Sequence, residues 1–142
     1  MIISNEALAD RGDYPGMWTA LLIGETNSEC DEISIQITHV QPDAEQGIHN
    51  HPESQCYYLI SGTGLMRIND ETKVVKCGDA VFIPGNSKHG IRNIGPTEMV
   101  YLTANKAFGR RIESQVWYKT ANARQKRMES SPSAARGSAR YE

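Results

Sequence analysis

Three of the four histidines in this chain stand in two short motifs that could hold a metal ion. The first motif contains His49 and His51, with Gln55 four positions further on, and the second contains His89. On a β-strand, side chains two positions apart leave the same face, so we expect both imidazoles of the first motif there, with Gln55 beside them if the strand continues after a bend. Imidazole nitrogens and one oxygen ligand form a donor set for a divalent transition metal, with the third imidazole arriving from a distant part of the chain.

The residues around these histidines form two blocks, one from Gly47 to Gly62 and one from Gly78 to Asn93. Both blocks resemble the signature motifs of the cupin superfamily, whose members are small β-barrel proteins. The family's first motif is His-x-His followed by Glu and Gly, and its second is Gly, Pro-x-Gly, His and Asn. The resemblance implies an all-β fold, a double-stranded β-helix (jelly-roll) barrel, around one metal ion. The metal ligands that it implies are His49, His51, Gln55 and His89.

This chain departs from the family pattern at two positions. Asn86 stands in place of the second Gly of Pro-x-Gly, and asparagine is the non-glycine residue that best tolerates a left-handed turn. Gln55 stands in place of the usual Glu, so neutral ligands leave the charge of a divalent ion uncompensated, and we expect anionic or enolic ligands to bind more tightly. Glu53 is an alternative carboxylate, which we expect to point away from the site. The donor set suits Fe, Mn, Co, Ni or Zn and does not choose between them.

Tyrosines are the main candidates for acid–base work. Tyr57 shares the parity of Gln55 and is expected to face the barrel interior near the metal. Tyr101 and Thr103 belong to a later strand that lines the same cavity in cupins. Packing is the competing interpretation, because a buried tyrosine needs a hydrogen-bond partner whatever its role. Two basic residues could hold an acidic substrate or simply lie at the surface: Arg92 and Lys106.

The ligand set is similar to that of two groups of cupin enzymes. Cupins that open cyclic unsaturated uronates use a metal and a carboxylate base, but no Asp or Glu stands on the corresponding strand, residues 99–103. Quercetinase-like dioxygenases bind an enolate and dioxygen side by side, and their usual carboxylate ligand is missing here. We predict a metal-dependent enzyme for a small oxygen-rich anion, a dioxygenase or a lyase/isomerase working through a metal-bound enolate. The alternative is a non-catalytic small-molecule-binding or sensing cupin, and a purely structural role is a third.

The elements that must position these residues are short strands. Apolar residues recur with a period of two, and Ile33, Ile35 and Ile37 alternate with polar residues, which predicts a strand with one buried face. Many short strands separated by glycine turns indicate a sandwich or a barrel. His39 matches no metal motif and is expected to cap or line a strand end. Besides the first histidine strand, strands are expected over residues 17–23, 56–60, 65–69, 72–76, 80–83, 89–93, 98–104 and 111–118.

Composition limits the classes of protein to which the chain can belong. Its 142 residues suit one domain, and a net charge of −2 argues against a general nucleic-acid binder. Three widely spaced cysteines, Cys30, Cys56 and Cys77, suit free thiols in a reducing compartment. No apolar run approaches the ~20 residues needed to cross a bilayer, and residues 1–13 do not read as a signal peptide. We therefore expect a cytoplasmic protein that does not enter membranes.

Charge is unevenly distributed, and we divide the chain accordingly. Residues 1–118 hold 9 basic and 15 acidic side chains, whereas residues 119–142 hold 6 basic and 2 acidic ones. We expect an N-terminal segment (1–14), a β-barrel domain (15–118) and a basic polar tail (119–142), which is disordered or forms a short helix over 119–129. A basic arm that docks on an acidic partner is the alternative for the tail. Cupin barrels usually pair through an N-terminal strand, so the resemblance implies a homodimer.

Overall fold

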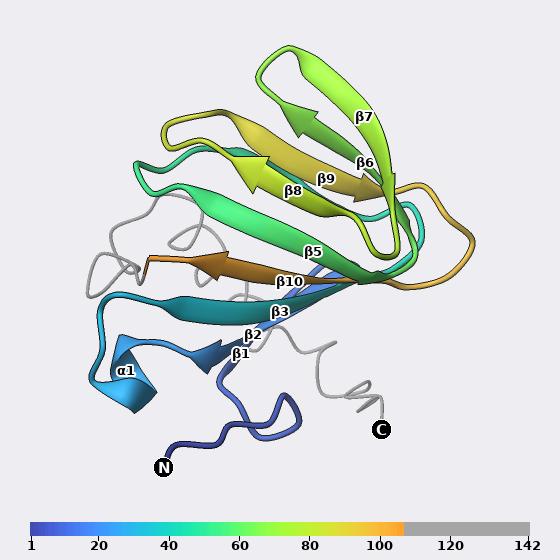
Figure 1. Cartoon of the computed structure of the whole chain (residues 1–142). Helices are drawn as coiled ribbons and strands as arrows, with labels where there is room; N and C mark the ends of the chain where they lie inside the picture. The colour runs from blue at the N-terminus through green and yellow to red at the C-terminus, as the bar shows by residue number, and fades with distance from the viewer. Residues whose placement is uncertain (107–142) are drawn as a thin grey trace, which may run out of the picture.

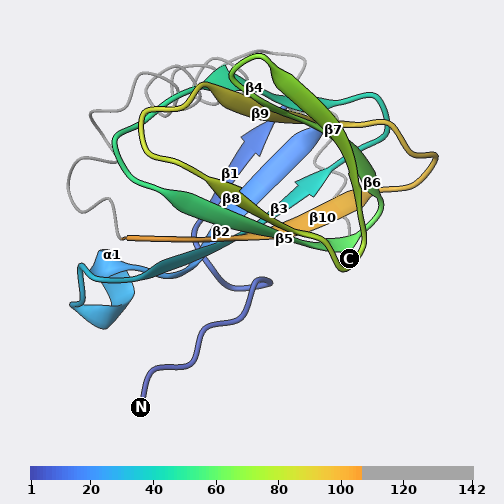
Figure 2. The same cartoon turned by 45° about the horizontal axis from the view of Figure 1, so that its top comes forward.

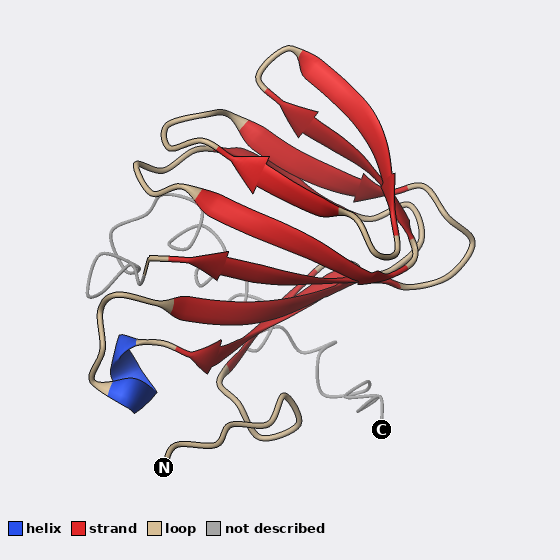
Figure 3. Cartoon of the chain, in the orientation of Figure 1, coloured by secondary structure: helices blue, strands red, loops and turns tan. Residues whose placement is uncertain are grey.

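The computed structural model describes residues 1–106, which form strands and one short helix (Figure 3). The strand and the helix expected over residues 111–118 and 119–129 lie outside these residues, as does the basic tail. No helix within residues 1–106 is both long and apolar enough to span a membrane. The elements are β1 (Arg11–Tyr14), β2 (Met17–Ile23), α1 (Glu25–Ser28), β3 (Ser34–Val40), β4 (Glu45–His49), β5 (Gln55–Ser61), β6 (Thr63–Ile68), β7 (Glu71–Lys76), β8 (Ala80–Ile83), β9 (His89–Asn93) and β10 (Met99–Asn105).

The strands form two antiparallel sheets that face each other (Figures 1 and 2). The larger sheet has the order β1-β2-β3-β10-β5-β8, and the smaller has the order β4-β9-β6-β7. The chain passes from one sheet to the other along its length. For example, β4 lies in the smaller sheet, and the next strand, β5, lies in the larger one. Strand β1 was not expected from the sequence and pairs with β2, with Gly12 opposite Thr19. The predicted all-β jelly-roll barrel is confirmed.

The core lies between the two sheets and contains both predicted tyrosines, Tyr57 and Tyr101. A second, smaller cluster covers the other face of the large sheet, where Ile37 packs with Ala20 and Val100. The alternating isoleucines of β3 therefore face outward rather than into the barrel, and Ile33 is half exposed. The main core consists of Val40, Tyr57, Leu59, Met66, Val75, Ile83, Ile91, Met99 and Tyr101.

One β-bulge determines which residues of β4 face the interior. Gln46 lies opposite Ile91 and His49 lies opposite His89, so β4 uses three steps where β9 uses two. The extra residue reverses the alternation, and Gln46 and His49 consequently line the same pocket although their spacing is odd. Gly90 permits this geometry, because a Cβ atom there would lie 2.7 Å from the backbone oxygen of Gln46.

A second close approach joins the two histidine motifs. A Cβ atom on Gly85 would overlap with the backbone oxygen of Pro52, so only glycine allows the turn after β8 to lie against the loop after β4. The next residue, Asn86, adopts the expected left-handed conformation with φ of 63°. Its backbone N–H donates to the backbone oxygen of His51 at 2.7 Å. The second motif is thereby bonded directly to the first.

Candidate metal centre

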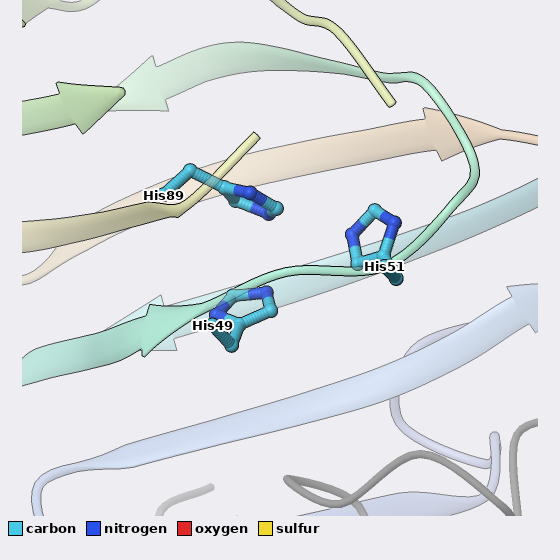
Figure 4. Close-up of side chains that lie close together, drawn as sticks. All are labelled: His49, His51 and His89. Carbon is cyan, nitrogen blue, oxygen red and sulfur yellow. The ribbon is translucent and has the colours of Figure 1, made fainter. Parts of the chain in front are cut away.

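Three imidazoles converge between the two sheets. His49 ends β4, His51 lies in the loop that follows, and His89 begins β9, with the three rings close together (Figure 4). One ring nitrogen from each histidine can be chosen so that all three lie within 4.8 Å of one another. The ring centroids of His49 and His89 are 4.2 Å apart, and those of His51 and His89 are 4.9 Å apart. Three of the four predicted ligands thus meet in one place.

The strand carrying His49 does not continue to Gln55, which the alternation argument had required. Strand β4 ends at His49, residues 50–54 form a loop, and Gln55 opens β5 in the other sheet. Gln55 nevertheless reaches the histidines, because its Oε1 lies 3.1 Å from Nε2 of His89. Its Nε2 donates to Oδ1 of Asn105 at 3.4 Å, which leaves the amide oxygen facing the histidines.

The contacts of the imidazole Nδ1 atoms orient two of the rings. Nδ1 of His49 lies 2.8 Å from the backbone oxygen of Gly47, and Nδ1 of His89 lies 2.8 Å from that of Ser87. A carbonyl oxygen can only accept, so Nδ1 carries the proton in each ring and the lone pair is on Nε2. This hydrogen bond is the one that metal-binding histidines commonly make with their second nitrogen.

The Glu53 carboxylate lies beside His51, on the Nδ1 side of the ring. Its Oε2 lies 3.8 Å from Nδ1 of His51, and both side chains are almost fully buried. We had expected Glu53 to point away from the site, but it lies in a loop that brings its side chain close to His51. A carboxylate behind a ligating imidazole increases the basicity of that imidazole and supplies negative charge near an ion.

The ionisation of the imidazoles also fits metal binding. Burial lowers the pKa of His49 from 6.5 to about 4, with smaller contributions from the neighbouring rings. Burial likewise lowers the pKa of His89. Both rings are neutral at pH 7 and need lose no proton to bind a metal. Two ligand atoms at ~2.1 Å from one ion and at right angles to each other lie about 3.0 Å apart. The 3.1 Å separation of the Gln55 oxygen from the His89 nitrogen matches that distance, so the residues present fit a divalent metal ion.

Two tyrosines and one glutamine form a second layer beside the histidines. The rings of Tyr57 and Tyr101 are stacked with centroids 4.6 Å apart, and the Tyr57 ring meets that of His89 edge-on at 6.3 Å. Both phenol hydroxyls donate to Oε1 of Gln46, at 2.9 Å from Tyr57 and 2.7 Å from Tyr101. Burial raises the pKa of both phenols well above the ordinary value, so both remain protonated donors. The catalytic role assigned to these tyrosines stays a prediction, and Gln46 was missed altogether.

The pocket beside the histidines is polar and small. Its volume is about 20 Å³, which is room for one or two water molecules. Its lining residues include amides, hydroxyls and one imidazole, and none has an acidic or permanently cationic side chain. Arg92 is half exposed and lies 3.8 Å from Asp43, away from this lining. The lining residues are Met17, Thr19, Gln36, Thr38, Gln46, His49, Gln55, Tyr57 and Thr103.

The fourth histidine, His39, belongs to a separate cluster on β3. Its ring stacks on that of Trp18 with centroids 4.0 Å apart. Nδ1 lies 2.8 Å from a carboxylate oxygen of Glu98, and Nε2 lies 3.1 Å from one of Glu6. His39 therefore links the N-terminal segment to the large sheet and plays no part in the metal centre.

Known proteins share this fold and part of the sequence. The oxalate-binding protein of Thermotoga maritima is 32% identical over 62 residues, which are 43% of this chain and 51% of that protein. KdgF from Halomonas has a TM-score of 0.63 at 18% identity, covering 75% of this chain and 94% of that one. Oxalate decarboxylase from Bacillus subtilis, with Mn(II) centres, has a TM-score of 0.63 at 25% identity, covering 67% of this chain and 27% of that one.

The chain spans about half the length of the curated relatives that it matches. The family model described as "Cupin domain" matches residues 36–105, a stretch that contains all three clustered histidines and Gln55. With the two facing antiparallel sheets and the bonded histidine motifs, this match shows that the chain belongs to the cupin superfamily.

Proposed function

We propose that this protein is a divalent-metal-dependent cupin enzyme that acts on a small oxygen-rich anion. The observation that carries the proposal is the convergence of His49, His51 and His89, with the Gln55 oxygen 3.1 Å from His89 Nε2. None of these four side chains would bring a negative charge to the ion. A divalent ion held by them would keep most of its charge for an anionic ligand. Iron, manganese, nickel and zinc all suit such a donor set.

Each part of the site contributes to binding the anion. A bound divalent metal supplies Lewis acidity, which favours the ionised form of a carboxyl or enol group. The histidines and Gln55 would hold the metal from both sheets, so the barrel fixes their mutual positions. Tyr57 lines the pocket, and Tyr101 stacks on its ring. With both phenol protons directed at Gln46, a proton would have to reach the substrate from water or through a rearranged tyrosine.

The substrate class follows from the size and polarity of the pocket. A volume of about 20 Å³ favours a ligand of few atoms over a flavonoid or a sugar acid, unless lining side chains move. The similarity to an oxalate-binding protein and to oxalate decarboxylase agrees with a small dicarboxylate. Oxalate is the first ligand to test. A lyase reaction on it would consume one proton and yield formate and carbon dioxide.

Binding without turnover is the second candidate function, and one observation favours it. None of the residues lining the pocket carries a carboxylate that could act as a general base, and both phenol hydroxyls already donate to Gln46. A cupin of this kind would hold its anion at the metal and release it unchanged. The two functions share the metal centre and differ only in product formation.

Metal content and ligand binding test the proposal in sequence. Apoprotein is reconstituted with Mn²⁺, Fe²⁺, Ni²⁺ or Zn²⁺ and analysed by mass spectrometry, with the His89→Ala variant as blank. We expect about one metal ion per chain in the wild type and little in the variant. Oxalate binding to the metal-loaded wild type is then measured by calorimetry, and we expect it to bind. Formate or oxygen uptake then separates an enzyme from a binding protein. A wild type with no more metal than the blank would overturn the proposal.

The homodimer implied by the cupin resemblance stays a prediction, which sedimentation equilibrium would test.

A further inference from the structure

We propose that Gln46 is the ligand-recognising residue of the pocket and that Tyr57 and Tyr101 are its positioning residues. The inference rests on the proposed function, since it concerns the anion that the metal centre would bind. It begins from a specific pattern: one amide oxygen accepts two phenol protons, at 2.9 and 2.7 Å. Such an amide can turn only by breaking two hydrogen bonds in a buried environment.

These two hydrogen bonds determine which end of the amide is free. Tyr57 and Tyr101 are almost completely buried, at 1% and 0% exposure. Each phenol must therefore donate its proton to an acceptor, and the Gln46 oxygen accepts both. The oxygen has two lone pairs, so it is saturated. Nε2 of Gln46 has no protein acceptor among residues 1–106, and it belongs to a side chain that lines the pocket. Two N–H donors are thereby available to a ligand.

Other donors in the pocket are already used or are not fixed. The Thr38 hydroxyl donates to Thr19, whose own hydroxyl donates to the backbone oxygen of Ile37. The Gln55 amide donates to Asn105. Within residues 1–106, the lining residues Gln36 and Thr103 have no comparable pair of hydrogen bonds that fixes their orientation. Gln46 thus differs from its neighbours, because two hydrogen bonds to its amide oxygen fix the direction of its Nε2 donor.

The same arrangement favours an anionic oxygen as the acceptor. Two O–H donors on the amide oxygen polarise the amide group and make its N–H groups better donors. The pocket offers no permanently cationic side chain, so recognition of an anion there depends on neutral donors and on the metal. Because the β4 bulge turns Gln46 toward the pocket that His49 lines, a small carboxylate could contact the metal and this amide together.

The substitution Gln46→Glu is the most direct probe of this role. The carboxylate keeps an acceptor for both phenols and removes the N–H donors. The variant is compared with wild type and with Asn50→Asp, which adds the same charge on an exposed side chain one residue from His49. All are loaded with Zn²⁺, and oxalate binding is measured by calorimetry at pH 8. We expect one metal ion per chain in all three, and a dissociation constant about 10- to 100-fold weaker in Gln46→Glu alone.

Further variants and one spectroscopic measurement complete the test of Gln46. Gln46→Met removes donor and acceptor together at similar length and serves if Gln46→Glu does not fold. The Tyr57→Phe and Tyr101→Phe variants each free the amide to turn, and we expect several-fold weaker oxalate binding with unchanged metal content. The side-chain amide resonances of Gln46 should also shift when oxalate is added to the zinc-loaded wild type. Metal-loaded Gln46 variants that bind oxalate as wild type does would overturn the inference and spare the proposed function. A metal-loaded wild type that binds no oxalate would instead overturn the proposed function and, with it, the inference.

Discussion

The amide oxygen of Gln55 lies 3.1 Å from Nε2 of His89, although the two residues come from different sheets. Their separation matches that of neighbouring ligands on one metal ion. The usual cupin carboxylate is replaced by this amide, so position 55 sets the charge of the four candidate ligands, while the Glu53 carboxylate lies behind His51. Metal affinity and anion affinity should therefore respond in opposite directions when that residue changes.

Replacing Gln55 by Glu tests this relationship. The added carboxylate would neutralise part of the charge of the ion, so we expect metal affinity to increase at least about tenfold, or ~1.4 kcal/mol. We expect the affinity for oxalate to fall, because less positive charge remains for it. A chelator competition titration measures the first effect, and calorimetry on the metal-loaded protein measures the second. Weaker metal binding in Gln55→Glu would show that position 55 does not contribute a ligand.

The bulge in β4 yields a prediction with a matched control. In Gly90→Ala, the new methyl group would lie 2.7 Å from the Gln46 backbone oxygen, so β4 must move. We expect the free energy of unfolding to fall by about 1–3 kcal/mol and metal affinity to fall with it. Gly47 lies in the same bulge, but a methyl group there would meet nothing within 4 Å. Gly47→Ala should therefore change stability by less than about 0.5 kcal/mol. Similar urea denaturation midpoints for the two variants would contradict the role of Gly90.

The buried imidazole of His49 predicts how the metal-free protein responds to acid. Its pKa is about 4 in the folded state and 6.5 when unperturbed, so the unfolded chain binds the proton more readily. Stability from this group is complete above pH 6.5 and is lost as the pH falls through about 4, by roughly 3 kcal/mol at most. Urea denaturation of the apoprotein at a series of pH values measures the loss. The His49→Gln variant lacks the titrating group, so its stability should fall less over this range. Parallel curves for the two proteins would be the contrary result.

Much of the fold could be predicted because alternation and glycine turns are local properties. Strands β2, β8 and β9 have the bounds that the pattern indicates, and the turn at Asn86 is left-handed as its residue type suggests. The histidines could be grouped because the motifs supply long-range information that periodicity lacks. Tyr57 was placed correctly in the interior by its parity with Gln55, since both lie on one regular strand, β5.

The remaining features depend on departures from regular alternation. Gln46 lies an odd number of residues from His49, and only the bulge brings the two to one face. The direction of Glu53 could not be taken from strand alternation, because the chain between His49 and Gln55 is a loop. The outward orientation of Ile37 was unpredictable for another reason: both faces of β3 are covered, and the inner one lines a polar pocket. In each case the side-chain direction is set by contacts between distant segments.

The His39 cluster leads to a prediction about the N-terminal segment. Both ring nitrogens lie within hydrogen-bond distance of carboxylates, so the ring can satisfy both Glu98 and Glu6 only when both nitrogens carry a proton. In His39→Gln, one side chain cannot bridge the two carboxylates and stack on Trp18 as the imidazole does. We expect faster hydrogen exchange of the backbone amides of Leu8 and Ala9, which donate to the Asn5 oxygen, with little change in the metal centre. Glu25→Gln, at an exposed position in α1, is the control and should leave this exchange unchanged. If exchange at Leu8 and Ala9 is the same in His39→Gln as in wild type, then the stack and the two carboxylate contacts do not hold the N-terminal segment against the large sheet.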